Sequence, residues 1–115
     1  MIQGKWLEVT AYILGKKSER VVKAHTFSKG KLVQHYRNPK VDDLVHRYRI
    51  DEKAIPPRLD LLYPDAFNSG KWLSYKGIYK LDGDTMIWCQ SLTGSPPKDF
   101  EPGEDNIVLK LKRMK

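Results

Sequence analysis

Apolar and polar positions alternate in short runs along most of the chain, and Gly, Pro, Asn and Asp separate the runs. A period of two places successive side chains on opposite faces of a β-strand, and no stretch sustains the 3.6-residue period of an amphipathic helix. The pattern therefore predicts a mostly β protein. The predicted strands span residues 5–14, 21–28, 31–37, 44–50, 58–63, 72–81, 85–92 and 107–112.

The strongest local signal is Asp82-Gly83, which lies between two alternating runs. Asp-Gly in this setting is typical of a tight β-hairpin. A two-residue type I′ loop would pair Tyr79 with Met86 across the hairpin. The same register would place Gly77 opposite Trp88, so that a small residue leaves room for a large one. A three-residue loop with a bulge would instead turn the other face of the second strand to that side.

Consecutive strands joined by short turns favour an all-β fold, a single antiparallel up-and-down barrel or half-open barrel of about eight strands. A β-sandwich is the alternative. The length of 115 residues predicts one domain over residues 1–115. Hydrophobic residues make up 40% and charged residues 30% of the chain, as in ordinary globular proteins.

The net charge of +7 favours anionic partners, although outward-facing lysines also protect β proteins from aggregation. No apolar run approaches the roughly 18 residues that a membrane-spanning helix needs. Cys89 is the only cysteine and the first residues lack the apolar stretch of a signal peptide. We therefore expect a cytoplasmic protein, or an exported form whose leader has been removed.

Several ordered motifs resemble the uncharacterised lipocalin-like domain family that is abundant in planctomycete bacteria. They are Gln3-Gly4-Lys5-Trp6, Phe27-Ser28-Lys29-Gly30-Lys31-Leu32, Tyr48-Arg49-Ile50-Asp51, Pro57-Arg58-Leu59-Asp60-Leu61, Gly77-Ile78-Tyr79-Lys80-Leu81-Asp82-Gly83-Asp84-Thr85 with Cys89 after it, Pro97-Lys98-Asp99-Phe100 and Val108-Leu109-Lys110-Leu111-Lys112-Arg113. The resemblance covers nearly the whole chain. It implies a small calycin-like barrel, no catalytic residues and no established ligand.

A barrel of this size can hold one small ligand if side chains do not fill it. We therefore expect a small-ligand-binding or interaction module, with an apolar or anionic ligand. The expected ligand-binding residues, all taken to face the interior, are Tyr12, His46, Tyr48, Tyr79, Trp88 and Gln90. Alternatively, these side chains fill a structural core. A pocket smaller than about 300 Å3 and blocked by Trp88, Tyr79 and Tyr48 would contradict the ligand hypothesis, since drug-sized sites are usually larger.

Other chemistry has weaker support in the sequence. His25, His35 and His46 are too far apart for a recognised zinc motif, and Cys89 has no signature of an activated nucleophile. Because no catalytic or nucleotide-binding fingerprint is present, we predict a non-catalytic protein without metal or cofactor.

Nucleic-acid binding is a second hypothesis, because basic and aromatic residues interleave in two strands. The residues concerned are His35, Tyr36, Arg37, Arg47, Tyr48 and Arg49. Leu44 and Ile50 favour an inward face for His46 and Tyr48, so Arg47 and Arg49 would form an outward stripe beside Lys31 and Arg37. An edge strand left by an incomplete barrel could also pair two copies in a homodimer.

Overall fold

The computed structural model describes residues 2–19, 22–65, 67–68 and 70–114, and every regular element in these ranges is a β-strand. The strands are β1 (Gly4–Ile13), β2 (Lys16–Ser18), β3 (Val22–Ser28), β4 (Lys31–Tyr36), β5 (Leu44–Asp51), β6 (Arg58–Pro64), β7 (Trp72–Tyr75), β8 (Gly77–Asp82), β9 (Thr85–Ser91) and β10 (Asn106–Arg113). No helix with the length and apolarity to span a bilayer occurs in these ranges.

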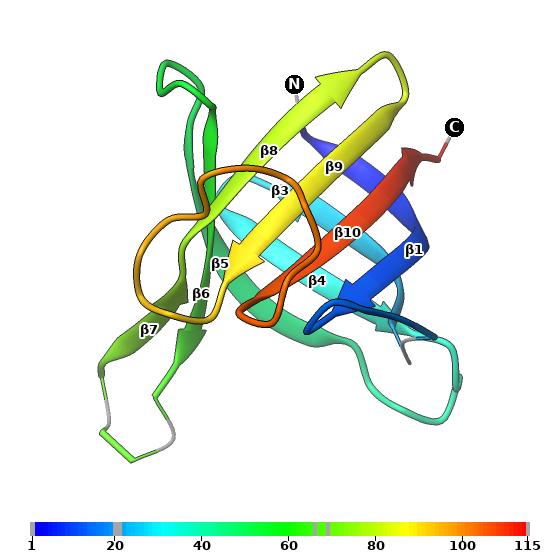
Figure 1. Ribbon diagram of the computed structural model, residues 1–115. Helices are drawn as coiled ribbons and strands as arrows, with labels where there is room; N and C mark the ends of the chain where they lie inside the picture. Colours follow the sequence, from blue (N-terminus) through cyan, green and yellow to red (C-terminus); the bar gives the residue numbers. More distant parts are fainter. Residues whose placement is uncertain (1, 20–21, 66, 69, 115) are drawn as a thin grey trace.

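Strand pairing closes the sheet into a barrel (Figure 1). Eight strands follow one another in the order β1, β3, β4, β5, β6, β8, β9 and β10, and β10 pairs back with β1. Strands β2 and β7 lie outside this ring, paired with β1 and β6 respectively. The prediction of an antiparallel barrel of about eight strands is thus confirmed. The half-open barrel and the sandwich are wrong, because the β1–β10 ladder joins the two ends of the sheet.

The strand predicted over residues 72–81 is interrupted at Lys76, so that β7 ends at Tyr75 and β8 begins at Gly77. β7 stays paired with β6, whereas β8 pairs with β9 along its whole length. The β6–β7 hairpin consequently extends beyond the barrel at the rim opposite the chain ends (Figure 1).

The β8–β9 turn differs from its predicted form. Asp82 pairs with Thr85, so the loop is Gly83-Asp84 rather than Asp82-Gly83. Gly83 has φ of +60° at the first loop position and Asp84 does not have a positive φ, which is typical of a type II′ turn. The predicted register is therefore wrong by two residues. Since two is also the side-chain period of a strand, the faces of both strands are unchanged.

In the observed register Tyr79 pairs with Trp88, and Gly77 pairs with Gln90. Gly77 nevertheless makes room for Trp88. A Cβ atom at Gly77 would collide with the carbonyl oxygen of Leu59 and lie 2.7 Å from Trp88 Nε1. Trp88 Nε1 donates a hydrogen bond of 2.9 Å to that same carbonyl. The close approach of β6 and β8 therefore requires a residue without a side chain at this position.

One row of side chains on each strand fills the barrel. The buried interior cluster consists of Ile2, Trp6, Ala11, Phe27, Leu32, Tyr48, Leu59, Leu61, Tyr79, Met86, Trp88, Leu109 and Leu111. Phe27 packs against both Tyr48 and Trp88, with ring centroids 5.2 and 5.7 Å apart. The aromatic residues expected to line or block the interior therefore fill its middle, which leaves no passage through the barrel.

The N-terminal segment closes the rim at which the chain ends lie. Trp6 Nε1 donates to the Ile2 carbonyl oxygen at 2.8 Å, and the Arg113 guanidinium lies 4.3 Å above the centre of the Trp6 ring. Arg113 also donates to the Gln3 carbonyl oxygen at 2.8 Å. Gln3 Nε2 in turn donates to the Tyr48 hydroxyl at 2.7 Å. Among the described residues, these contacts seal one rim of the barrel.

A second apolar cluster lies on the outer face of the barrel. Ile78, Cys89 and Val108 are each next in sequence to an inward-facing residue, and they form a separate buried group. Tyr12 and Phe100 pack over this group. The inward position predicted for Tyr12 is wrong, because the bulge in β1 between Glu8 and Thr10 shifts its alternation and Ala11 faces the interior instead.

This outer cluster predicts that Cys89 is unreactive in the folded protein. Burial, with a smaller effect of the Asp99 charge, raises the pKa of the Cys89 thiol to about 11. At about pH 8 roughly one thiol in a thousand is ionised, and the side chain is fully buried. We expect Ellman's reagent to label Cys89 only as fast as the protein unfolds. Phe100→Ala should accelerate labelling, whereas Leu92→Ala, which removes an exposed side chain of the same loop, should not. Immediate stoichiometric labelling of the unmodified native protein would contradict this prediction.

Candidate functional site

The unsealed rim holds a recess of about 290 Å3, here called the mouth recess. The ends of β4, β6, β7 and β9 and the starts of β5 and β10 surround it. Its lining residues are Gln34, His46, Leu61, Tyr63, Tyr75, Gln90 and Ile107. Leu61 belongs to the interior cluster, against which Tyr75 and Ile107 also pack. The packed core therefore forms the floor of the recess.

Two glutamine side chains give the mouth recess its polar character. Gln34 and Gln90 are 7% and 3% exposed. Among the described residues neither carboxamide has a hydrogen-bond partner, and both border the recess. A carboxamide offers two donors and two acceptor lone pairs, and neither glutamine has an atom among the fully buried side-chain atoms that lack a partner in the described residues, so both carboxamides reach the recess. Water or a ligand in the recess is the available source of those partners.

His46 adds an uncharged imidazole to the same wall. Its Nδ1 atom is buried and has no hydrogen-bond partner among the described residues. Burial lowers the pKa of His46 from its ordinary value, which favours the neutral ring at neutral pH. As a neutral imidazole, His46 has one donor and one acceptor nitrogen.

Two tyrosines from the β6–β7 hairpin form the outer wall. The rings of Tyr63 and Tyr75 lie 4.9 Å apart at an interplanar angle of 34°. Burial raises the pKa of the Tyr63 phenol, and the adjacent Tyr75 and the Asp65 charge raise it further. The Tyr63 hydroxyl therefore stays protonated at neutral pH. Because the lining contains no Lys, Arg, Asp or Glu among the described residues, the recess is suited to a neutral polar molecule.

The six residues predicted to bind a ligand occupy three different places. His46 and Gln90 line the mouth recess, while Tyr48, Tyr79 and Trp88 belong to the packed core beneath it. Tyr12 lies with the outer cluster. Sequence reasoning missed five lining residues: Gln34, Leu61, Tyr63, Tyr75 and Ile107. The period-two alternation indicated that these residues face the interior. No local pattern indicated at which height along the barrel axis a recess remains.

The residues considered for nucleic-acid binding are also separated. Tyr48 is buried in the interior, and His35 is held by Thr26 Oγ1 at 2.7 Å and by Asp43 at 2.9 Å. Arg47 and Arg49 are exposed on the outside of β5, as predicted from the inward face of its neighbours. The six residues therefore do not form one surface.

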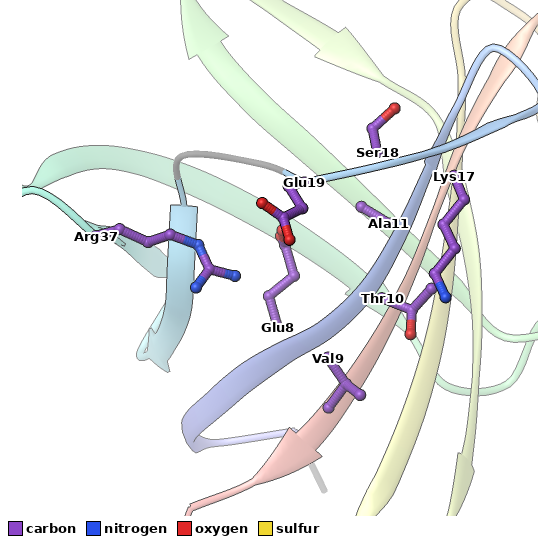
Figure 2. Close-up of a pocket in the computed structure, with 8 residues that line it drawn as sticks. All are labelled: Glu8, Val9, Thr10, Ala11, Lys17, Ser18, Glu19 and Arg37. Atoms are coloured by element: carbon purple, nitrogen blue, oxygen red, sulfur yellow. The ribbon is translucent and has the colours of Figure 1, made fainter.

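A second hollow, of about 480 Å3, lies where β1 leaves β3 (Figure 2). It is lined by Glu8, Val9, Thr10, Ala11, Lys17, Ser18, Glu19 and Arg37. Two acidic and two basic side chains share it, and Figure 2 shows Arg37 extending from the end of β4 toward the Glu8 side. Glu8 Oε1 is 2.9 Å from Nε2 of the buried His25. Its charges are balanced within it, so it offers less to a ligand than the mouth recess.

Metal binding has no support in the geometry. No group of three or more His, Cys, Asp or Glu side chains that could hold a metal ion occurs within residues 2–19, 22–65, 67–68 and 70–114. The three histidines have separate surroundings: His25 contacts Glu8, His35 contacts Asp43, and His46 lines the recess.

No protein-family model matches the chain, and comparisons with curated proteins and with solved structures return no match.

Proposed function

We propose that the protein is a non-catalytic binding module whose mouth recess holds a small, uncharged, polar molecule. The supporting observation is the pair Gln34 and Gln90, two almost completely buried residues whose carboxamides have no hydrogen-bond partner among the described residues and reach the recess. A closed antiparallel barrel with one accessible end also supports, as a proposal, membership of the lipocalin-like family that the sequence motifs resemble.

The volume limits the size of the ligand. About 290 Å3 corresponds to roughly ten water molecules and lies just below the roughly 300 Å3 at which drug-sized pockets begin, so a drug-sized ligand does not fit. The core aromatics exclude a long chain from the barrel, because the space below Leu61 is occupied by packed side chains. The largest ligand that fits the mouth recess is therefore a single ring that carries hydrogen-bonding groups.

The lining chemistry also narrows the ligand class expected from the sequence. An apolar ligand would leave the carboxamides of Gln34 and Gln90 without partners in a site now closed to water. An anion would be buried without a cation, since no described Lys or Arg lines the recess. A neutral molecule with both donors and acceptors would satisfy the glutamines and stack against Tyr63 or Tyr75.

The proposal can be tested with small probes and NMR. We expect neutral polar rings such as uracil, 2-pyrrolidone or glucose to shift the side-chain amide signals of Gln34 and Gln90, and toluene and acetate to leave them unchanged. Gln90→Leu should weaken binding at least about tenfold, the equivalent of losing one or two hydrogen bonds. Its free energy of unfolding should stay within about 1 kcal/mol of the parent value, because the Gln90 carboxamide makes no hydrogen bond to the described residues that the substitution would break.

Gln3→Leu is the matched control at the sealed rim. The Gln3 carboxamide already bonds to the Tyr48 hydroxyl and accepts from the Lys29 backbone N–H at 3.1 Å. We expect this variant to lose about 1–3 kcal/mol of stability and to keep its affinity for the probes. The proposal fails if none of the polar probes binds, or if Gln90→Leu unfolds as readily as Gln3→Leu while probe binding persists.

A further inference from the structure

A second site, independent of the mouth recess, lies on the outside of the barrel. A groove of about 360 Å3, here called the basic groove, runs beside the β3–β4 turn and is lined by Lys29, Gly30, Lys31, Arg47, Tyr48 and Leu62. Three of these residues are basic and none is acidic. Lys29, Lys31 and Arg47 are all exposed. The groove therefore concentrates positive charge on a chain whose net charge is +7.

The register places two of these cations directly opposite each other. Lys31 on β4 pairs with Arg47 on β5, so both side chains point outward from adjacent strands. Like charges in such a cross-strand pair repel and destabilise the sheet. Neither residue has an ion-pair partner among the described residues. An anion bound between them would remove this repulsion, which is the first indication of a ligand.

An exposed tryptophan lies next to the cations. Trp72 on β7 is 44% exposed, and the Arg47 guanidinium is 4.8 Å from the centre of its ring. Arg47 pairs with Leu62, and Leu62 pairs with Ser74, so β5, β6 and β7 form one continuous outer surface here. Trp72 extends this surface beyond Ser74. Cations beside an exposed aromatic ring are the combination that binds phosphates and stacks unpaired bases.

We infer that the basic groove binds single-stranded nucleic acid, with Lys29, Lys31 and Arg47 contacting phosphates and Trp72 stacking on a base. A single strand is favoured over a duplex, because paired bases are already stacked and do not present a free face to Trp72. The sequence pattern included Lys31 and Arg47 but neither Lys29 nor Trp72. Tyr48 borders the groove although it belongs to the interior cluster, and His35 is engaged by Asp43.

The intrinsic fluorescence of the protein gives a direct readout. Trp6 and Trp88 are fully buried, so Trp72 is the one tryptophan that a ligand on the outer surface can contact. We expect an oligouridine of about twelve nucleotides, within the span that one small barrel covers, to quench this fluorescence. The affinity should fall as salt rises from about 50 to about 200 mM, with a slope of about −2 in a plot of log affinity against log salt for three phosphates.

Two double variants that remove the same charge distinguish binding at the basic groove from general electrostatic attraction to the protein. Lys31→Ala/Arg47→Ala should weaken binding at least about tenfold and reduce the salt slope to about −0.7, since one phosphate contact remains. Lys110→Ala/Lys112→Ala is the control, because both lysines are exposed on β10, four strands away from β5 in either direction around the barrel. It should change the affinity less than threefold or so, through the net charge alone.

Stability and stacking provide the remaining readouts. Lys31→Ala should leave the urea midpoint unchanged or higher, because it relieves the repulsion from Arg47. Trp72→Leu keeps an apolar side chain on the strand and should weaken oligouridine binding about tenfold, with little effect on binding of inorganic polyphosphate. Because this variant lacks the reporting tryptophan, its affinity is measured by the fluorescence anisotropy of a labelled oligouridine, and the polyphosphate affinity by calorimetry.

Four outcomes would overturn the inference: no binding of oligouridine at low salt, an equal loss in both double variants, no effect of Trp72→Leu, or tighter binding of duplex RNA than of the single strand. Binding to phosphatidylserine vesicles that is lost in Lys31→Ala/Arg47→Ala, without binding of oligouridine, would also overturn it and assign the groove to a lipid surface.

Discussion

Trp88→Ala is expected to lower the free energy of unfolding by about 3–5 kcal/mol, a large part of the total stability of a small domain. Trp88 is fully buried in the middle of the barrel and packs against Phe27 and against the edge of His25. Its removal leaves a large cavity that strands from opposite walls cannot collapse to fill. It also leaves the Leu59 carbonyl oxygen without its 2.9 Å hydrogen bond from Nε1. Urea unfolding followed by far-ultraviolet circular dichroism measures the loss.

Trp88→Phe is the matched variant. It keeps an aromatic ring in the core but removes the indole N–H, so it should cost about 1–3 kcal/mol and less than alanine. Gly77→Ala should behave differently, because it adds an atom where the Leu59 carbonyl and Trp88 Nε1 already meet. Combined with Trp88→Phe, whose ring lacks the Nε1 atom, the added methyl should cost less than in the parent protein. Equal costs in both backgrounds would show that Gly77 does not make room for Trp88.

Glu8→Leu is expected to lower the free energy of unfolding by about 3–5 kcal/mol, although leucine resembles glutamate in size and is apolar. Glu8 Oε1 lies 2.9 Å from Nε2 of His25, and the two side chains are 3% and 0% exposed. Both lie in the wall where β1 and β3 separate. The loss of stability comes from His25, because its buried imidazole loses the carboxylate that faces it.

The double variant Glu8→Leu/His25→Leu tests that explanation. Replacing both members of a buried pair by apolar side chains is often close to neutral, so the double variant should recover most of the stability lost in Glu8→Leu. Glu8→Gln, which keeps a hydrogen-bond acceptor and donor in place, should cost about 1 kcal/mol. If the double variant is no more stable than Glu8→Leu, the pair does not act as a unit and the loss belongs to Glu8 alone.

Most of the confirmed predictions about the fold came from the alternation of side chains along the strands. The pattern around Leu44 and Ile50 correctly placed His46 and Tyr48 inside and Arg47 and Arg49 outside. It failed at Tyr12. A bulge between Glu8 and Thr10, in the pairing of β1 with β10, reverses the alternation before the chain reaches Tyr12. A local pattern contains no information about such a bulge.

Only part of the candidate site followed from the sequence. His46 and Gln90 were predicted to face the interior and do line the mouth recess. Tyr63 and Tyr75 also line the recess, because β7 is separate from β8 and pairs with β6 beyond the rim of the barrel. The sequence pattern predicted one continuous strand there, whereas β7 pairs with β6 up to Tyr75 and β8 pairs with β9 from Gly77. The change of partner involves residues far apart in the chain.

The amino-acid sequence by itself determined that the chain forms short antiparallel strands, where most of them begin and end, and which face of nearly every strand is apolar. These properties depend on neighbours two to four residues away. The tertiary structure alone decided the register at Gly83-Asp84, the closure of β1 on β10, the rim that Ile2 and Trp6 seal, and the cross-strand pair of Lys31 and Arg47. Each depends on contacts between distant segments, whose free energies are set by the whole barrel, and these contacts create both candidate binding sites.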